Sequence, residues 1–335
     1  MKTWEEKRIL VTGGAGLIGS AVVWALNRRG AEGIVVCDRL GSTEKWRNLA
    51  PLRFADYLEA DELLPRLQSG ALGRFDLAIH LGACSRTTEK DAAFLIRNNF
   101  EFTKDLAAWA LAHKTRFVYA SSAATYGNGE EGMSDMENRL ERFRPLNMYG
   151  YSKHLFDLHA RCHGWLAHIT GLKYFNVFGP NENHKGEMRS LVQKSHGSVV
   201  QSGVIRLFKS GRPDYPDGGQ QRDFLYVKDA AAMTLHLAAH PTAVGLFNLG
   251  SGVARAWNDL ARAVFAALGR EPVIEYVEMP DSLRGQYQYD TRADIGRLRA
   301  SGYDRAITSL EDAVADYVRN YLVPGKLLGD GAGES

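Results

Sequence analysis

A glycine-rich segment near the start of the chain constrains the fold more than any other feature. Gly13, Gly16 and Gly19 follow an apolar run at residues 9–11 and accompany the start of a helical pattern over residues 17–27. This order predicts a buried strand, a tight turn at Gly13, and a helix that packs closely at Gly19. Unpaired N–H groups at such a helix start, assisted by the helix dipole, bind a pyrophosphate that approaches at Gly16. The alternative is a glycine turn in some other strand–helix unit.

An acid follows the next strand pattern. Residues 34–37 read as a strand that ends in Asp38, 19 residues after Gly19. An acid at this position of a dinucleotide-binding unit bonds an adenosine ribose hydroxyl, which favours NAD. Arg39 and Lys45 stand close by, and their cations suit the additional phosphate of NADP. Two cations against one acid favour NADP as the cofactor, with NAD as the alternative.

The first 175 residues alternate strand and helix patterns. Strand patterns cover residues 8–12, 34–37, 53–55, 76–80, 116–120 and 169–175, and helical patterns cover 17–27, 62–68, 92–113 and 151–162. Such alternation predicts an α/β fold with a doubly wound parallel sheet of the Rossmann type, whose ligands lie beyond the carboxyl ends of the strands. Asp38, residues 81–85, residues 121–122 and Asn176 all follow predicted strands, so we expect them at one sheet edge.

The pattern changes after Asn176. Residues 179–186 and 211–221 read as loops, with helices expected over 188–199 and 257–268 and strands over 204–208, 222–227, 245–249 and 273–277. We therefore expect a smaller, discontinuous α/β substrate domain at residues 176–222 and 253–324. The dinucleotide-binding domain would comprise residues 1–175 and 223–252. The small, polar tail at 325–335 is expected to be disordered.

Composition excludes several classes of protein. The net charge of +2 gives no sign of nucleic-acid or anionic-membrane binding, and we expect neither partner. No apolar run is long enough to span a bilayer, and the polar first six residues do not resemble a signal peptide. Cys37, Cys84 and Cys162 are odd in number and scattered, which favours the reducing cytoplasm over a disulfide framework or zinc site.

Tyr149 and Lys153 are four residues apart, which places them on one face of a helix. A phenol with a pKa of about 10 is a poor base at neutral pH. A neighbouring ammonium and a positive nicotinamide ring stabilise the phenolate and bring it into range. Lys153 can also hold the nicotinamide ribose, and Ser122 can bond the same substrate hydroxyl as Tyr149. The alternative is a chance spacing.

The glycine pattern, residues 119–127 and the Tyr149/Lys153 pair resemble the extended short-chain dehydrogenase/reductase superfamily. Residues 81–89, residues 174–180 and the segment His184-Lys185-Gly186 narrow this likeness: they resemble the ADP-L-glycero-D-manno-heptose 6-epimerase family. The resemblance runs from about residue 8 to residue 321. It implies a Rossmann-type domain with tightly held NADP, a cytoplasmic homo-oligomer that is pentameric in the family, and a nucleotide-activated heptose destined for the lipopolysaccharide core.

The resemblance also implies roles for individual residues. Tyr149 and Lys185 would be the two acid/base residues, supported by Ser122 and Lys153. The cofactor would be bound by Gly13, Gly16, Leu17, Ile18, Gly19, Asp38, Arg39, Lys45, Leu81, Gly82, Ala83, Cys84, Ser85, Asn98, Lys153, Val177 and Lys185. The substrate would be bound by Ser122, Asn176, Glu187, Lys194, Phe208, Lys209, Arg222 and Tyr287. Glu187 and Lys194 depart from the serine and histidine of the best-known members, and a carboxylate there would repel the substrate diphosphate unless turned away or paired.

The chemistry of the expected reaction explains why two proton carriers are needed. Carbon 6 of the heptose bears a secondary hydroxyl and no acidic hydrogen, so deprotonation cannot invert it. Transient oxidation with NADP gives a planar ketone that turns in the site, and hydride then returns to its opposite face. The alternatives are another NAD(P)-dependent sugar-nucleotide epimerase or dehydratase, and a non-catalytic dinucleotide-sensing protein. His159 and His163 are spaced to share a metal ion but have no visible third ligand, so we expect no metal site.

Overall fold

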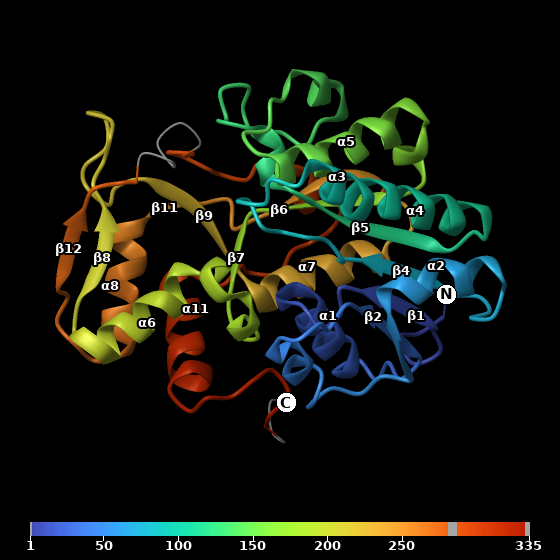
Figure 1. The fold of residues 1–335 in the computed structure, drawn as a ribbon, viewed down its shortest axis with the longest axis horizontal. Coiled ribbons are helices and arrows are strands. Elements are labelled where there is room, and N and C mark those ends of the chain that lie inside the picture. The colour runs from blue at the N-terminus through green and yellow to red at the C-terminus, as the bar shows by residue number, and fades with distance from the viewer. Residues whose placement is uncertain (1, 281–286, 332–335) are drawn as a thin grey trace.

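The computed structural model describes residues 2–280 and 287–331. Its centre is a seven-stranded sheet in the order β10-β6-β5-β4-β1-β2-β3, in which every pair of neighbours is parallel. The strands are β1 (Ile9–Thr12), β2 (Ile34–Asp38), β3 (Asp56–Glu59), β4 (Leu77–His80), β5 (Arg116–Ser122), β6 (Thr170–Tyr174) and β10 (Gly245–Leu249). The predicted doubly wound parallel sheet is confirmed (Figure 1).

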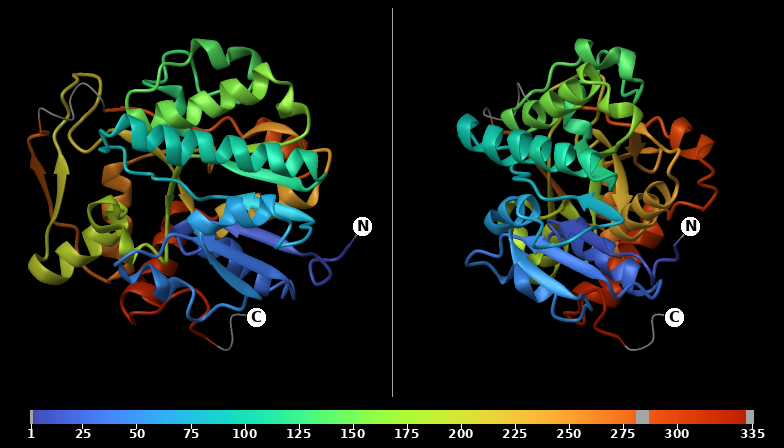
Figure 2. Two further views of the ribbon diagram at one scale, coloured as in Figure 1. Left: turned by 45° about the vertical axis from the view of Figure 1, so that its right-hand side comes forward. Right: turned by 90° about the vertical axis from the view of Figure 1, so that its right-hand side faces the viewer.

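Helices cover both faces of this sheet because successive strand residues point to opposite sides. Ile9 and Val11 face the cluster that holds α1 (Leu17–Asn27) and α7 (Val227–Ala239). Leu10 faces the cluster that holds α2 (Ala60–Gln68), α4 (Phe102–Ala112) and α5 (Met148–Cys162). Figure 2 shows α4 and α5 on one side of the sheet and α7 on the other.

The chain leaves the large sheet after β6 and builds a second lobe before and after β10. We use this name for β7 (Asn176–Phe178), α6 (Leu191–Ser202), β8 (Ile205–Phe208), β9 (Gln221–Tyr226), β11 (Ala254–Ala256), α8 (Trp257–Ala267) and β12 (Ile274–Val277). Its strands form a three-stranded sheet, β11-β9-β7, and a parallel pair, β12-β8. Figure 1 shows β8 and β12 far from the large sheet.

The described chain ends in α10 (Gly296–Ala300), α11 (Leu310–Asp316) and the π-helical turn η7 (Tyr317–Leu322). One apolar cluster joins residues of both lobes, including Val22 of α1, Val199 of α6, Leu260 of α8 and Val314 of α11. The division into two domains stays a prediction. Strand β9 crosses the boundary expected between residues 222 and 223. Both strands that pair with it, β7 and β11, belong to the second lobe, so the whole of β9 belongs there too.

Three local expectations are wrong. The strand expected at 53–55 lies at Asp56–Glu59, where acidic residues tolerated on an exposed edge obscure the strand pattern. The helix expected over 92–113 is divided into α3 (Ala92–Leu95), the π-helical turn η2 (Ile96–Glu101) and α4. The helix expected from residue 188 begins at Leu191, because Ser190 caps it by accepting a hydrogen bond from the Gln193 N–H.

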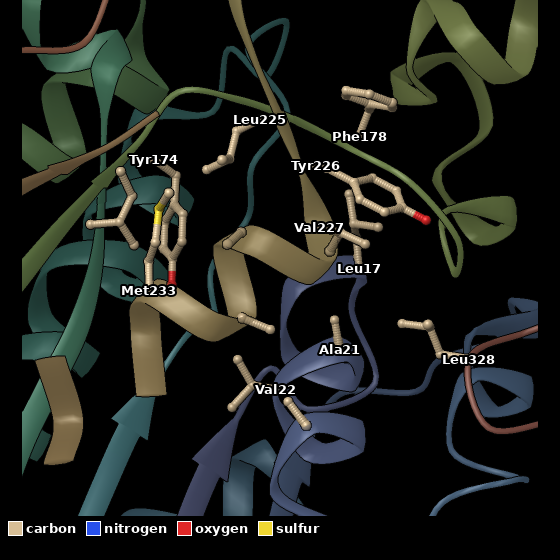
Figure 3. Packing of buried hydrophobic residues seen from close by; sticks show 14 of the residues in the cluster. Leu17, Ala21, Val22, Tyr174, Phe178, Leu225, Tyr226, Val227, Met233 and Leu328 are labelled. Carbon is tan, nitrogen blue, oxygen red and sulfur yellow. The ribbon is translucent and has the colours of Figure 1, made fainter. Parts of the chain in front are cut away.

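The structure describes residues 325–331 of the tail that composition predicts to be disordered, and the disorder itself stays a prediction. Leu328 is fully buried, and its N–H donates to Asn181 Oδ1 at 3.0 Å. Figure 3 shows the Leu328 side chain near Ala21 of α1. A single buried leucine therefore anchors a segment whose small, polar composition predicts disorder. Residues 332–335 of the predicted tail lie outside the described residues.

Candidate active site

A cavity of ≈ 790 Å³ lies at the carboxyl edge of the large sheet. The turn between β1 and α1, the ends of β2, β4 and β5, helix α5, and the loop after β7 all contribute to its wall. Every residue predicted to bind the cofactor or to act in catalysis lines it: Gly13, Gly16, Leu17, Ile18, Gly19, Asp38, Arg39, Lys45, Leu81, Gly82, Ala83, Cys84, Ser85, Asn98, Ser122, Tyr149, Lys153, Val177 and Lys185. The roles of these residues stay predictions.

The three predicted glycines have different reasons to be glycine. Gly13 has a φ of +67°, and a Cβ there would lie 2.6 Å from the backbone nitrogen of Gly82. A Cβ on Gly19 would collide with the carbonyl oxygen of Gly13. A Cβ on Gly16 would have one neighbour within 4 Å, the Gly13 carbonyl oxygen at 3.2 Å. The space beside Gly16 therefore opens into the cavity. Gly16 also precedes α1 without a side-chain cap, which leaves the first-turn N–H groups for an anion.

The carboxylate of Asp38 is already engaged by its surroundings. Its Oδ2 accepts the Ala15 N–H at 2.8 Å, and its Oδ1 accepts the Arg39 N–H at 2.7 Å. The Lys45 ammonium forms an ion pair with the same Oδ1. The Arg39 side chain pairs with Asp61. Asp38 therefore holds the glycine turn in place and has its charge balanced by Lys45.

Tyr149 and Lys153 lie one turn apart on α5, which begins after Asn147 accepts a hydrogen bond from the Gly150 N–H at 2.8 Å. Burial raises the pKa of Tyr149, and its hydrogen bond with the Ser122 hydroxyl opposes this. Lys153 donates to the Ala120 carbonyl oxygen at 2.9 Å. Burial lowers the pKa of Lys153 to about 8, although the charge of Asp157 opposes the shift. The chain thus places a phenol, a hydroxyl and an ammonium together at the end of β5.

A buried ion pair supports this end of β5 from beneath. Lys173 of β6 and Asp157 of α5 are both fully buried, and their nitrogen and oxygen are 2.6 Å apart. Asp157 also accepts hydrogen bonds from Tyr119 at 2.9 Å and from Ser121 at 2.7 Å. Lys173 donates a second bond to Thr125 at 2.7 Å. The pair ties β5, β6 and α5 together directly under the predicted catalytic residues.

Lys185 reaches the cavity from the short 3-10 turn η6 (Asn183–Met188), in the loop after β7. Burial lowers the pKa of its ammonium, and the charge of Glu182 opposes this. His184 also lines the cavity, and burial together with the charges of Lys45 and Lys185 lowers its pKa to about 4. Tyr149 and Lys185 thus face one cavity from two separate elements.

The predicted substrate residues other than Ser122 do not line this cavity. Arg222 of β9 is largely buried, with its guanidinium carbon 4.8 Å from the ring centre of Tyr287 and 5.6 Å from that of Trp257. Trp257 donates from its indole N–H to the Tyr287 hydroxyl at 2.8 Å. Arg222, Tyr287 and Trp257 therefore form one stacked cluster, and the predicted substrate-binding role of the first two stays a prediction.

The other members of this group are more exposed. Asn176 opens β7, Phe208 ends β8, and the exposed ammonium of Lys209 pairs with Glu278 at 2.8 Å. Glu187 points fully into solvent and lies 3.6 Å from the Lys194 ammonium. This carboxylate is therefore both turned into solvent and paired with Lys194, the two arrangements that would limit its repulsion of a diphosphate.

Three buried polar residues that sequence reasoning missed hold the cavity loops in place. Asn48 donates from its amide nitrogen to the carbonyl oxygens of Ala15 and Asn181, both at 2.9 Å. Asn99 accepts the Cys84 N–H at 2.9 Å and returns a bond to the Cys84 carbonyl oxygen at 3.0 Å. Asn181 is the third of these residues, and its side-chain amide donates to Ser20 of α1 at 3.0 Å. In the sequence, Asn99 stands inside a predicted helix and Asn181 inside a predicted loop, and nothing local sets either residue apart.

Two further features of the described residues bear on other functions. No helix in residues 2–280 and 287–331 has the length and apolar character to span a membrane. In the same residues, no group of three His, Cys, Asp or Glu side chains is placed to hold a metal ion. His159 of α5 and His163, the residue directly after this helix, have ring centres 4.0 Å apart and pack against Trp165.

The cavity fits a dinucleotide. Gly16 leaves open space beside uncapped N–H groups, and Lys45 and Arg39 stand at one end of the cavity with Lys153 and Tyr149 among its other wall residues. Residues 9–250 match the model of the NAD dependent epimerase/dehydratase family. The chain therefore belongs to this family.

Individual relatives give a more specific comparison than the family model does. The chain is 52% identical over 314 residues to the ADP-L-glycero-D-manno-heptose-6-epimerase of Nitratidesulfovibrio vulgaris, covering 93% of this chain and 97% of the relative. It is 42% identical over 324 residues to the enzyme of the same name from Fusobacterium nucleatum, covering 94% and 98%. The solved structure of the Helicobacter pylori ADP-L-glycero-D-manno-heptose-6-epimerase matches with a TM-score of 0.80 at 26% identity, covering 95% and 96%. The resemblance predicted from the sequence is confirmed.

Proposed function

We propose that this chain inverts carbon 6 of ADP-D-glycero-D-manno-heptose, giving ADP-L-glycero-D-manno-heptose. The relatives at 42–52% identity over nearly their whole length carry the name of this activity. The observation that supports the reaction within the structure is the cavity itself, where Tyr149 of α5 and Lys185 of η6 face the same space from separate elements. Inversion through a ketone needs such a pair, because the two orientations of the ketone present their oxygen to different parts of the wall.

A bound nicotinamide dinucleotide supplies reversible hydride removal at carbon 6. Tyr149 takes the hydroxyl proton of the sugar, and the Lys153 ammonium beside it stabilises the phenolate. Ser122 donates to the same oxygen and orients it. Lys185 exchanges a proton with the sugar oxygen when the ketone is in its second orientation. The cavity walls, which include the ends of β1, β2, β4, β5 and β6 and helix α5, would retain the intermediate.

We further propose that the cofactor is NADP. In an NAD site the acid after the second strand bonds the ribose hydroxyls. Here the Asp38 carboxylate accepts two backbone N–H groups and the Lys45 ammonium, so its charge is compensated. The Arg39 guanidinium, which is exposed and paired with Asp61, lines the same cavity and is a second cation within reach of a ribose phosphate. Protein purified without added cofactor is expected to release mainly NADP(H) on denaturation, measured by chromatography of the nucleotides. Release of NAD alone would overturn this assignment.

The roles of the second lobe are also proposals. Arg222 and Tyr287 would hold the nucleotide end of the substrate, because a guanidinium stacked on aromatic rings suits a diphosphate beside a planar base. Asn176, Phe208, Lys209, Lys194 and Glu187 would complete that region. We propose in addition that the chain is a cytoplasmic homo-oligomer, a pentamer as in the family. Cys37, Cys84 and Cys162 are free thiols, which suits a reducing compartment, and light scattering after gel filtration measures the assembly.

One experiment tests the reaction. Incubation with ADP-D-glycero-D-manno-heptose in D₂O, followed by NMR, is expected to show inversion at carbon 6 without deuterium there, and without net change in absorbance of the nicotinamide. Deuterium at carbon 6 would show deprotonation and contradict the hydride route. Failure to convert this sugar, with turnover of another nucleotide-sugar, would instead favour a different epimerase or a dehydratase of the same family. Binding without turnover of any nucleotide-sugar would favour a dinucleotide sensor.

A further inference from the structure

The loop that carries Lys185 is closed by a carboxylate with no contact to solvent. Glu182 is fully buried at the start of this loop. Its Oε2 accepts the Ser190 N–H at 2.6 Å, and its Oε1 accepts the Ser190 hydroxyl at 2.5 Å. Because Ser190 caps α6, the Glu182 side chain joins the two ends of the segment 182–190. A buried carboxylate costs free energy unless such bonds compensate it, so this placement is specific.

The residue before Glu182 fixes the loop to the cofactor side of the cavity. Asn181 is buried and has a φ of +77°, a conformation that few residues other than glycine adopt. Its Nδ2 donates to Ser20 of α1 at 3.0 Å, and its carbonyl oxygen accepts the Asn48 amide at 2.9 Å. The start of the Lys185 loop is therefore held rigidly against the helix that follows the glycine turn.

Glu182 also supplies charge. The Lys185 N–H donates to the Glu182 carbonyl oxygen at 3.0 Å, which places the two residues one 3-10 turn apart. Burial lowers the pKa of the Lys185 ammonium, and Glu182 is the group whose charge opposes this. Burial and the Glu182 charge also raise the pKa of Tyr317, so η7 packs against the same carboxylate. The titratable side chains that share the cavity wall with Lys185 are Cys37, Asp38, Arg39, Lys45, Cys84, Arg86, Glu89, Tyr149, Lys153, Tyr174 and His184.

We propose that Glu182 is a positioning residue for Lys185: its buried carboxylate closes the loop 182–190, which holds Lys185 in the cavity wall, and places a buried negative charge one 3-10 turn away in the chain. The importance of this for catalysis rests on the proposed proton-transfer role of Lys185. The closure of the loop does not, because it follows from the hydrogen bonds between Glu182 and Ser190.

Two substitutions test separately how Glu182 closes the loop 182–190 and how its charge acts on Lys185. In Glu182→Gln the amide oxygen still accepts the Ser190 N–H, and the amide NH₂ donates to the Ser190 hydroxyl oxygen, so both links between the loop ends persist while the charge is removed. In Glu182→Ala both links are lost and the loop opens to water. Glu187→Gln is the matched control, because it removes an equal charge from an exposed position of the same loop.

The measurement is the titration of Lys185 itself, independent of turnover. Trace acetylation of the purified protein over a range of pH, quantified for the Lys185 peptide by mass spectrometry, reports the fraction of free amine. We expect Glu182→Gln to shift the Lys185 midpoint to lower pH, giving several-fold faster labelling at neutral pH. We expect Glu182→Ala to shift it to higher pH, because burial is the largest cause of the lowered pKa and water removes that cause. Glu187→Gln is expected to leave the midpoint unchanged.

Each outcome is decisive. An unchanged midpoint in Glu182→Gln would overturn the charge coupling. Equal shifts in Glu182→Gln and Glu187→Gln would mean that general loop charge, not the buried carboxylate, acts on Lys185. If Glu182→Ala leaves the proteolysis rate of residues 183–189 unchanged, the closing role is wrong. A protein that passes these tests but does not epimerise the heptose would contradict the proposed function while leaving this inference intact.

Discussion

The two lobes that are proposed to share the substrate are stabilised by different kinds of polar contact. Near the carboxyl edge of the large sheet, Lys173 and Asp157 form a fully buried ion pair. In the second lobe the ion pairs of Arg206 with Glu275 and Lys209 with Glu278 are exposed. Buried pairs fix geometry because a misplaced charge there has no water to bond, whereas exposed pairs adjust at little cost. The difference indicates a rigid half for the chemistry and an adaptable half for the substrate.

The largest expected effect concerns the rigid half. Tyr149→Phe and Lys185→Met should each lower kcat by about 10²–10⁴ with a small change in KM, because each removes a proton carrier. Both variants should keep bound nucleotide and still dismutate a substrate analogue with an aldehyde at carbon 6, which needs one base. Steady-state kinetics measure kcat and KM separately for each variant. A normal kcat with raised KM in Lys185→Met would make Lys185 a binding residue.

The next effect tests rigidity directly. Lys173→Met leaves the Asp157 carboxylate buried and unpaired, so we expect the free energy of unfolding to fall by about 3–5 kcal/mol. The double variant Lys173→Met with Asp157→Asn removes both charges and should recover most of the loss. Arg206→Met breaks an exposed pair in the second lobe and should change stability little. Urea unfolding compares the three variants; equal losses for Lys173→Met and Arg206→Met would remove the distinction between the lobes.

A third effect concerns the adaptable half. Arg222→Met should raise KM by roughly 10- to 100-fold, the range of one lost charge-assisted bond, and leave kcat nearly unchanged. Arg212→Met is the matched control, since Arg212 is an exposed arginine paired with Asp214. Initial rates at varied substrate concentration separate the two parameters. A fall in kcat without a change in KM would show that Arg222 acts on the reacting carbon and that the two halves are not divided in this way.

Sequence reasoning predicted the rigid half better because its signals are local. The helix at Leu17–Asn27, the end of β2 at Asp38 and the one-turn spacing of Tyr149 and Lys153 depend on neighbouring residues. A parallel sheet then brings strand ends to one edge without further information. The stacking of Arg222 on Tyr287 joins residues 65 positions apart, and the burial of Glu182 depends on Ser190 and η7. No local pattern encodes such contacts.

The lack of a local signal for contacts between distant residues also explains two other differences from expectation: the buried Leu328 in the tail and the division of the helix expected over residues 92–113. Leu328 is a lone apolar residue in a small, polar segment, and only the position of α1 and Asn181 shows that it has a place to pack. The π-helical turn η2 adds backbone where Asn99 must reach Cys84, a requirement that comes from the loop after β4 and not from residues 92–113 themselves.

The smallest expected effect concerns Glu187, the residue that departs from the family pattern. Its side chain is fully exposed and pairs with Lys194, so its charge is solvated and partly balanced before any diphosphate arrives. Glu187→Ser should therefore change KM by less than about twofold at physiological salt, because screening weakens an exposed charge. The change should grow at low ionic strength, and KM measured at two salt concentrations checks this. A large fall in KM that is insensitive to salt would place the carboxylate against the bound diphosphate, and the second lobe would then close around its substrate more tightly than its exposed ion pairs indicate.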